Sequence, residues 1–351
     1  MKEYMNYLRK VDPYVPGEQP NLPNMIKLNT NENPYPPSPK VKEVWKQFSQ
    51  NDLRLYPDPT SHKLNKAIAD YYGLDESQVF TGVGSDDVLA MCFMTFFNSE
   101  KPILFPDITY SFYPVWAKLF DVKYEAIKLN ENFCIEKEDY FKENGGIIFP
   151  NPNAPTGVEL PLSEIEEILK HNPDSIVIAD EAYIDFGGQS ALSLLEKYDN
   201  LIIVQTFSKS RSMAGMRIGF AIGSPVLIKA LHDVKYSFNS YTLNRMTIEI
   251  GAAAMADKAY FEETVQKIIE TREWSKKEFK KLGFNFFDSK SNFIFVTHPN
   301  YNAKDLFLAL RENNIFVRYF NADRINNYLR ITIGTKKEME TLFDFLKSYI
   351  K

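Results

Sequence analysis

Short apolar runs rich in Ile, Val and Phe recur through the middle of the chain, and helical patterns separate several of them. The runs have the length of β-strands and cover residues 103–105, 147–149, 176–179, 201–204 and 218–222. Strands that alternate with helices form a mostly parallel sheet with helices on its faces. The sequence therefore predicts an α/β fold built around a mostly parallel central sheet.

The length of the chain, 351 residues, favours two lobes, because one hydrophobic core rarely organises so many residues. Residues 1–25 are rich in Tyr, Pro and Asn, show little periodicity and resemble an arm. Beyond residue 240 the pattern changes, and residues 257–282 indicate one long charged amphipathic helix. We predict an arm with part of the small domain at residues 1–30, a large domain at 31–239 and a small α/β domain at 240–351.

Helix positions are predicted from apolar spacing and from capping motifs. Apolar residues recur at helical spacing between residues 40 and 50. A Ser or Thr three residues before a Glu is the capping-box spacing, and it occurs at Ser163 with Glu166 and at Thr335 with Glu338. We therefore expect a helix to begin at each of these sites.

The composition argues against several classes of protein. A formal net charge of −5, with 44% hydrophobic and 25% charged residues, indicates a globular chain without a general attraction for nucleic acid or anionic membranes. Cys92 and Cys134 are isolated and the four histidines are scattered, so we expect neither a disulfide framework nor a metal site. The first residues lack an apolar signal core, and the most apolar stretch, 88–97, is about half as long as a membrane span. We expect a soluble cytoplasmic protein with no nucleic-acid or membrane partner.

An acid, a phenol and an amine follow two predicted strands. Asp180 and Tyr183 come after the run at 176–179, and Lys209 lies 29 residues beyond Asp180, after the next run. Parallel strands end at the same edge of a sheet, where open α/β sheets bind ligands. There Lys209 could form an imine with an aldehyde cofactor, and Asp180 would favour the protonated form of a pyridine nitrogen. Tyr183 could hydrogen-bond a phenolic oxygen of the same ring. Taken alone, Asp180 is also explained as a helix cap.

Further small and basic residues indicate a phosphate site. Gly84, Ser85 and Asp86 form a turn before an apolar helical run, so their backbone N–H groups can face an anion. Ser208 and Arg217 could hold a dianionic phosphate by charge-assisted hydrogen bonds. The turn is neither a dinucleotide fingerprint nor a P-loop. By itself it is explained by a helix cap, and Arg217 by itself by a solvated basic face.

Together these segments resemble the pyridoxal-phosphate-dependent aminotransferases of fold type I, and most closely the histidinol-phosphate aminotransferases. The resemblance covers nearly the whole chain and rests on residues 14–17, 31–34, 56–58 and 82–86, on Asp180 with Tyr183, on Ser208 and Lys209 with Arg217, and on residues 329–335. These motifs are jointly specific for the fold type and less so for the substrate. The resemblance implies a fold type I α/β transferase with pyridoxal 5'-phosphate as cofactor and small molecules as amino donor and 2-oxo acid acceptor.

The resemblance also implies roles for individual residues. Lys209 would be the Schiff-base lysine and proton shuttle, with Asp180 on the pyridine nitrogen and Tyr183 on the phenolic oxygen. Tyr110 would stack on the ring, and Tyr56 would cross to the cofactor phosphate of a partner subunit, which implies a homodimer. The other residues implied to bind the cofactor, chiefly its phosphate, are Gly84, Ser85, Asp86, Thr206, Ser208 and Arg217. With 20 tyrosines in the chain, a core or turn position is the alternative for Tyr56 and Tyr110.

The sequence departs from the family pattern at Ala154. Many relatives have an asparagine at this point, directly before Pro-Thr-Gly, and it bonds the phenolic oxygen of the cofactor. Either Asn153 or Asn151 replaces that contact, or Tyr183 holds the oxygen alone. Asp87 stands where glutamate is more usual, which we expect to matter little because the backbone binds the ligand there.

Substrate recognition must accommodate a phosphate ester in histidinol phosphate and an α-carboxylate in glutamate. By resemblance Arg330 binds the carboxylate, and it could pair with either anion, while Arg318 and Tyr14 could supply further donors. Asn33 is the fourth residue expected at the substrate. A surface salt bridge explains Arg318 nearly as well, and Tyr14 could instead be a packed residue of the arm.

The expected reaction is reversible amino transfer from L-histidinol phosphate to 2-oxoglutarate, giving imidazole acetol phosphate and L-glutamate, as in histidine biosynthesis. Related threonine-phosphate decarboxylases share the same motifs and differ in the bond that is broken. An aromatic amino acid aminotransferase is a second alternative, and a non-catalytic binding protein is a third. The intact set of Lys209, Asp180 and Arg217 argues against the third.

Overall fold

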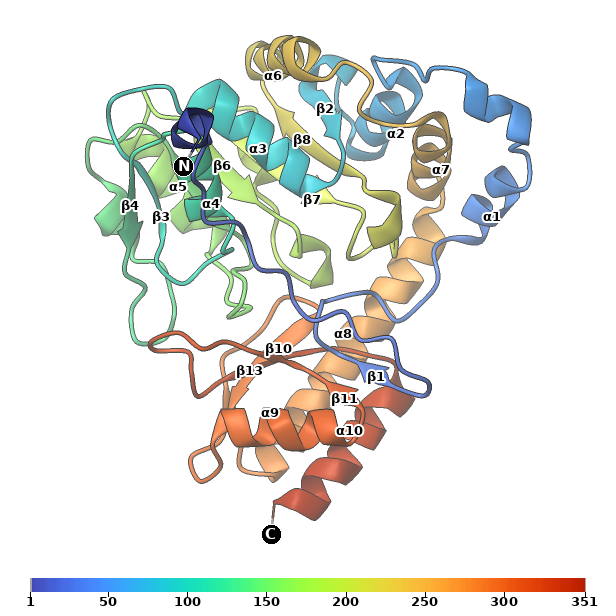
Figure 1. Ribbon diagram of the computed structural model, residues 1–351, viewed down its shortest axis with the longest axis vertical. Coiled ribbons are helices and arrows are strands. Elements are labelled where there is room, and N and C mark those ends of the chain that lie inside the picture. Colours follow the sequence, from blue (N-terminus) through green and yellow to red (C-terminus); the bar gives the residue numbers. More distant parts are fainter. Residues whose placement is uncertain (1, 351) are drawn as a thin grey trace.

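A seven-stranded sheet forms the centre of the larger lobe in this computed structural model, which describes residues 2–350 (Figure 1). Its strands, in spatial order, are β2 (Val79–Gly82), β8 (Gly219–Gly223), β7 (Leu201–Thr206), β6 (Val177–Asp180), β5 (Ile147–Pro150), β3 (Ile103–Pro106) and β4 (Tyr124–Ile127). Neighbouring strands are parallel except where β8 runs antiparallel to β2 and to β7. The predicted α/β fold with a mostly parallel sheet is confirmed.

Helices cover both faces of this sheet because its strands are buried on both sides. Ile178 of β6 lies in one core, whereas its neighbours Val177 and Ala179 lie in the core on the opposite face. The first core is covered by α3 (Ser85–Phe96), α4 (Tyr113–Leu119) and α6 (Pro225–Phe238), and the second by α5 (Leu162–His171). A further core at the β2 edge is formed with α1 (Pro39–Trp45), α2 (His62–Tyr72) and α7 (Arg245–Met255).

The smaller lobe contains a four-stranded antiparallel sheet below the larger lobe in Figure 1. Its strand order is β12 (Arg318–Tyr319), β13 (Leu329–Thr332), β10 (Phe293–Thr297) and β9 (Asn285–Phe286). Its helices are α8 (Lys258–Lys281), α9 (Ala303–Glu312) and α10 (Lys336–Tyr349). The segment after the arm joins this lobe, since β1 (Ile26–Lys27) pairs in parallel with β11 (Ile315–Phe316). The predicted domain boundaries at residues 30 and 240 stay predictions.

The long helix α8 connects the lobes (Figure 1). Asp257 and Leu282 are its cap residues, so the predicted helix at 257–282 is confirmed. Arg272, near the middle of α8, is buried and donates from Nη1 to the carbonyl oxygen of Phe186 at 2.7 Å and to that of Ser291 at 2.9 Å. A single guanidinium thus ties a turn of the larger lobe to a loop of the smaller one.

The two predicted helix starts have different outcomes. Thr335 and Glu338 form the predicted capping box, with Thr335 Oγ1 accepting from the Glu338 amide at 3.3 Å and Glu338 Oε2 accepting from the Thr335 amide at 2.6 Å. The predicted cap at Ser163 is wrong, because Pro161 is the N-cap and the helix has already begun at Leu162. Glu166 instead accepts a hydrogen bond from the hydroxyl of Tyr198 at 3.2 Å.

Smaller differences concern element ends. The predicted helix at 40–50 is shorter, since α1 ends at Trp45 and a 3₁₀ helix follows at Gln50–Arg54. The strands predicted at 176–179 and 218–222 each begin one residue later than expected. Among residues 2–350, no helix combines the length and the apolar character that a bilayer crossing requires.

Candidate active site

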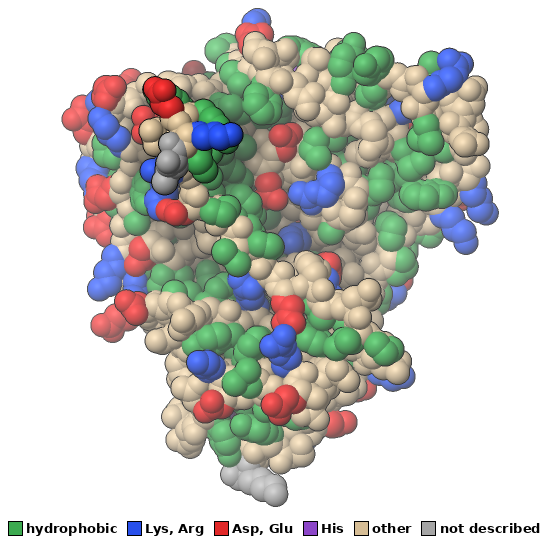
Figure 2. Space-filling model, viewed as in Figure 1, with side chains coloured by type: hydrophobic (Ala, Val, Ile, Leu, Met, Phe, Trp, Pro, Cys, Tyr) green, Lys and Arg blue, Asp and Glu red, His purple; other side chains and the backbone are tan. Residues whose placement is uncertain are grey.

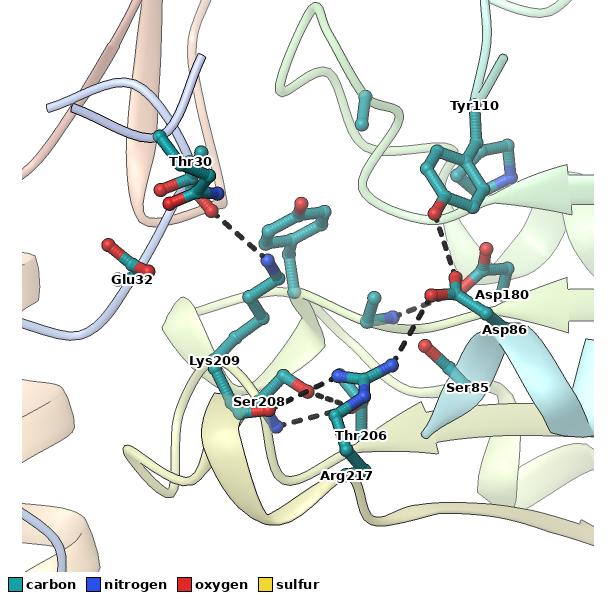
Figure 3. A pocket seen from close by; sticks show the side chains of 16 residues that line it. Thr30, Glu32, Ser85, Asp86, Tyr110, Asp180, Thr206, Ser208, Lys209 and Arg217 are labelled. Atoms are coloured by element: carbon teal, nitrogen blue, oxygen red, sulfur yellow. Dashed lines mark hydrogen bonds and ion pairs between the residues drawn. The ribbon is translucent and has the colours of Figure 1, made fainter. Parts of the chain in front are cut away.

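The predicted acid, amine and phosphate residues meet at one edge of the central sheet. Asp180 is the last residue of β6, Thr206 is the last residue of β7, and Lys209 follows three residues later. Because β6 and β7 are parallel neighbours, their ends lie side by side. A cavity of about 240 Å³ opens there, and the predicted residues that line it are Ser85, Asp86, Tyr110, Asp180, Tyr183, Thr206, Ser208, Lys209 and Arg217 (Figure 3).

Lys209 points its amine into this cavity from a firmly held loop (Figure 3). Nζ donates to the carbonyl oxygen of Thr30 at 3.3 Å and lies 5.6 Å from the ring centroid of Tyr183. The Asn33 side chain donates to the carbonyl oxygens of Lys209 and Ser210, each at 3.1 Å. These hydrogen bonds hold the backbone of Lys209 in place and so fix the position of its Cα atom. Asn33 lies behind the lysine and outside the residues that line the cavity, and its substrate role stays a prediction.

Asp180 is a buried carboxyl whose charge needs a partner. Its Oδ2 accepts from the Tyr113 hydroxyl at 2.8 Å, and its Oδ1 accepts from the Ala182 amide at 3.3 Å. Burial raises the pKa of Asp180 to about 7, although these two hydrogen bonds oppose the rise. A cationic N–H group in the cavity would favour the ionised form. Asp180 is therefore suited to hold a protonated ring nitrogen.

The opposite part of the cavity gathers hydrogen-bond donors that can bind a doubly charged anion. The helix α3 begins at Ser85, so its first N–H groups have no partner within the helix. Gly84 has φ +85°, and a Cβ there would collide with the Arg217 guanidinium. The Thr206 hydroxyl donates to Ser208 Oγ at 3.0 Å, which aligns two hydroxyls beside that guanidinium. Amide, hydroxyl and guanidinium donors together match a phosphate.

Asp86 links this donor group to an aromatic wall (Figure 3). Its Oδ1 accepts from the Tyr110 hydroxyl at 2.7 Å, and its Oδ2 lies 3.4 Å from Arg217 Nη2. Tyr110 also contacts Tyr113 edge to face, with ring centroids 5.9 Å apart. Tyr110 therefore presents a fixed ring to the cavity, as a stacking residue must.

A second cavity of about 160 Å³ adjoins the first and shares Thr30, Tyr110, Ala154, Tyr183 and Lys209 with it. It brings together the predicted substrate residues Tyr14, Arg318 and Arg330. Figure 2 shows the hollow between the two lobes, with Lys and Arg side chains inside it.

Arg330 is the most constrained group of the second cavity. Its Nη2 donates to the carbonyl oxygen of Asn29 at 3.1 Å, whereas its buried Nε has no hydrogen-bond partner among the described residues. Burial lowers the pKa of Arg330, and the neighbouring charge of Arg318 lowers it further. The Tyr14 ring stacks on Phe112, with centroids 4.1 Å apart, so the arm forms part of the wall. These contacts leave donors of Arg330 for an anionic ligand.

Three predicted cofactor residues, Gly84, Tyr56 and Asn153, are not among the residues that line either cavity. Tyr56 is 79% exposed, contacts Tyr241 with ring centroids 4.8 Å apart, and lines a separate surface pocket. Asn153 donates to the carbonyl oxygen of Ile108 at 2.9 Å and to Thr156 Oγ1 at 3.0 Å. The alternative Asn151 bonds Leu160, so both asparagine side chains serve their own turn. Their cofactor roles stay predictions.

Sequence reasoning gave no individual role to several polar residues at this site. Asn31 is buried and donates from Nδ2 to the Tyr183 hydroxyl at 2.9 Å. Thr332 from β13 contacts Asn31, and Tyr113 contacts Asp180. Asn31 lies in the motif at 31–34 and Thr332 in the motif at 329–335. Membership of these motifs was the sequence evidence that could have pointed to both residues. Their pairing across 301 positions of sequence could not be read from either motif alone.

Comparison with known proteins adds family information to this geometry. Residues 23–346 match the family model described as aminotransferase class I and II. The chain is 56% identical over 348 residues to the histidinol-phosphate aminotransferase of Lactococcus lactis subsp. cremoris (strain MG1363), covering 99% of this chain and 98% of that protein.

Two solved structures share the fold at lower sequence identity. The histidinol-phosphate aminotransferase from Clostridium acetobutylicum has a TM-score of 0.85 at 24% identity, covering 93% of this chain and 99% of that chain. The histidinol-phosphate aminotransferase from Sinorhizobium meliloti in complex with pyridoxal-5'-phosphate has a TM-score of 0.82 at 21% identity, covering 93% of this chain and 91% of that chain.

Proposed function

The chain belongs to the class I and II aminotransferase family, and from this premise we propose that it exchanges an amino group between L-histidinol phosphate and 2-oxoglutarate. The products are imidazole acetol phosphate and L-glutamate, a reaction of histidine biosynthesis. The proposal rests on the 56% identity to a histidinol-phosphate aminotransferase and on the pair of arginines beside Lys209.

The first cavity fits pyridoxal 5'-phosphate as cofactor. Arg217, Ser208 and the start of α3 would bind its phosphate, and Asp180 would bind its ring nitrogen. When bound, this group supplies an aldehyde that condenses with amines and a ring that withdraws electrons from the adjacent carbon. The fit is supported by the Arg217 guanidinium beside Gly84 and by the buried Asp180, whose hydrogen-bond partners within residues 2–350 are the uncharged Tyr113 hydroxyl and Ala182 amide.

Lys209 is the group that would move the proton. Lys209 lines both cavities, so its Nζ can reach the reacting carbon of a substrate in the second cavity. The amine can remove a proton from this carbon and then deliver a proton to a neighbouring atom. Asn33 holds the backbone of Lys209, which leaves the side chain free to make this short movement. Thr30 accepts from Nζ through its carbonyl oxygen and offers the amine a resting position.

The second cavity would hold the anionic group of either substrate. Arg330 and Arg318 line it together, and a phosphate ester or an α-carboxylate can accept hydrogen bonds from both guanidinium groups. The Tyr14 hydroxyl adds a donor from the arm, which a phosphate with three terminal oxygens uses better than a carboxylate does. One cavity can thus serve both half-reactions.

The reaction is tested by absorbance in a single turnover of purified, cofactor-loaded protein. Addition of L-histidinol phosphate should convert the cofactor to its pyridoxamine form. Conversion by phenylalanine in preference to L-histidinol phosphate would support an aromatic amino acid aminotransferase instead. Release of carbon dioxide from threonine phosphate would support a decarboxylase, and a spectrum unchanged by every amine would support a binding protein.

Assembly and location form the remaining part of the proposal. The chain forms a homodimer in which Tyr56 reaches the cofactor phosphate of the partner subunit. The side chains of Leu53, Tyr56 and Tyr241 are all exposed here. They offer an apolar surface that a second copy of the chain would cover. We place the enzyme in the cytoplasm.

A further inference from the structure

Asn31 connects three parts of the chain at the cofactor cavity. It follows the arm, its side chain contacts Tyr183 of the larger lobe, and its backbone and side chain contact Thr332 of the smaller lobe. Asn292, also in the smaller lobe, donates to the carbonyl oxygen of Asn31 at 2.9 Å. Asn31 has φ +57°, a conformation that Asn and Asp adopt more readily than most residues. Its side chain is thus held from several sides.

The donor and acceptor roles in this chain of hydrogen bonds follow from chemistry. The Asn31 backbone amide can only donate, and it donates to Thr332 Oγ1 at 3.0 Å. The Thr332 hydroxyl hydrogen is therefore free to donate to Asn31 Oδ1, also at 3.0 Å. With Oδ1 occupied, the side-chain amide presents Nδ2 to the Tyr183 hydroxyl, at 2.9 Å.

Tyr183 must then accept from Asn31, and its own hydrogen has to point elsewhere. The Tyr183 side chain lines both cavities, and neighbouring lining residues Pro150, Ala154 and Ala182 carry no polar side-chain group. The cavity is thus the direction in which a bound ligand can accept the Tyr183 hydrogen. A small alanine at position 154 leaves this hydroxyl without a competing side-chain donor from that residue.

We propose that Asn31 is a positioning residue that fixes the Tyr183 hydroxyl as a donor toward the phenolic oxygen of the cofactor. This inference rests on the proposed cofactor and concerns residues of the chain itself. Thr332 sets the orientation of the Asn31 amide, and the amide sets the direction of the Tyr183 hydrogen. The smaller lobe thereby controls the charge on the phenolic oxygen through the hydrogen bonds that link Thr332, Asn31 and Tyr183.

The test is the substitution Asn31→Asp, which keeps the size and the backbone preference of the residue but replaces the donor by an acceptor. The carboxylate would accept from Thr332 and from Tyr183, which withdraws the Tyr183 hydrogen from the cavity. The phenolic oxygen then keeps more negative charge and holds a shared proton to higher pH. We expect the pH midpoint of the visible band of the bound cofactor to rise by about one unit.

A second background separates the hydrogen bond from the added charge. In the Tyr183→Phe background no hydroxyl remains, so Asn31→Asp should move the midpoint by less than half as much as in the wild type. Thr332→Val removes only the group that orients the amide and adds no charge. It should raise the midpoint in the same direction by a smaller amount.

Either of two results would overturn this role of Asn31. One is a shift of equal size with and without the Tyr183 hydroxyl, which would leave charge as the sole cause. The other is an unchanged midpoint in both Asn31→Asp and Thr332→Val. Neither result affects the proposed reaction, provided that the visible band of the wild-type protein responds to L-histidinol phosphate. A wild-type protein without a visible band would contradict both the proposed reaction and the role of Asn31.

Discussion

Arg318 and Arg330 stand directly opposite each other on the antiparallel strands β12 and β13. Both line the second cavity, and within residues 2–350 neither has a carboxylate within ion-pair distance. Two neighbouring guanidinium groups without counter-charge repel each other, and an anion placed between them removes that cost. The pair explains why the cavity should select substrates with a negatively charged end.

The first prediction distinguishes the role of Arg318 from that of Arg330 in substrate binding. Arg318→Ala should raise the KM for L-histidinol phosphate about 10- to 100-fold, the loss expected for one hydrogen bond to a charged group, and should affect glutamate less. A phosphate has more acceptor oxygens for Arg318 than a carboxylate that Arg330 already holds. Half-reaction kinetics with each amino donor measure the difference, and equal losses for the two donors would contradict it. Arg324→Ala is a matched control, because Arg324 pairs with Asp107 outside both cavities.

The second prediction concerns the covalent position of the cofactor. Borohydride reduction of the loaded protein should tag the peptide that contains Lys209, and Lys209→Ala should abolish both the tag and turnover. Lys235 provides an internal control, because it is a buried lysine outside both cavities and donates from Nζ to the Pro59 carbonyl oxygen at 2.7 Å. Peptide mass analysis checks the site, and a tag on Lys235 or undiminished turnover of Lys209→Ala would refute the assignment.

A third prediction follows from the buried carboxyls at the end of β6. Burial raises the pKa of Asp180 and that of Glu181 to about 7. As pH rises from about 4 to 7, the unfolded chain releases these protons before the folded chain does, so the cofactor-free protein should lose stability in that range. The loss per carboxyl is at most on the order of 4 kcal/mol.

Denaturant unfolding at several pH values measures this loss. Asp180→Asn should flatten the decline of the unfolding free energy between about pH 4 and 7, since one of the titrating groups is gone. Bound cofactor should flatten it as well, because a protonated ring nitrogen favours the ionised Asp180. Stability that rises with pH across this range in the cofactor-free protein would be inconsistent with a protonated Asp180.

The fourth prediction tests assembly through Tyr56. Sedimentation should give the mass of a dimer, and Tyr56→Phe should weaken cofactor binding about 10-fold through the loss of one hydrogen bond to phosphate. Tyr241→Phe is the matched control, since the two rings are neighbours on the same exposed surface. A monomer with unimpaired cofactor binding would rule out a contribution of Tyr56 across an interface.

The sequence predicted the fold and the meeting of Asp180 with Lys209 at one sheet edge, because both follow from the order of strands along the chain. Apolar strand runs place Asp180 and Lys209 after parallel neighbours, and this fixes their meeting point. The cap at Ser163 failed because Pro161 starts the helix earlier than the Ser-Glu spacing suggested. The contact of Asn31 with Thr332 joins segments 301 positions apart, so only the tertiary structure reveals it.

Arg272 has a consequence for the angle between the two lobes. Its guanidinium holds Phe186 of one lobe and Ser291 of the other by their carbonyl oxygens, and both contacts are buried. A charge enclosed in this way is costly to release, because its polar partners would have to separate together. These two buried contacts therefore oppose any change in the angle between the lobes that would separate Phe186 from Ser291.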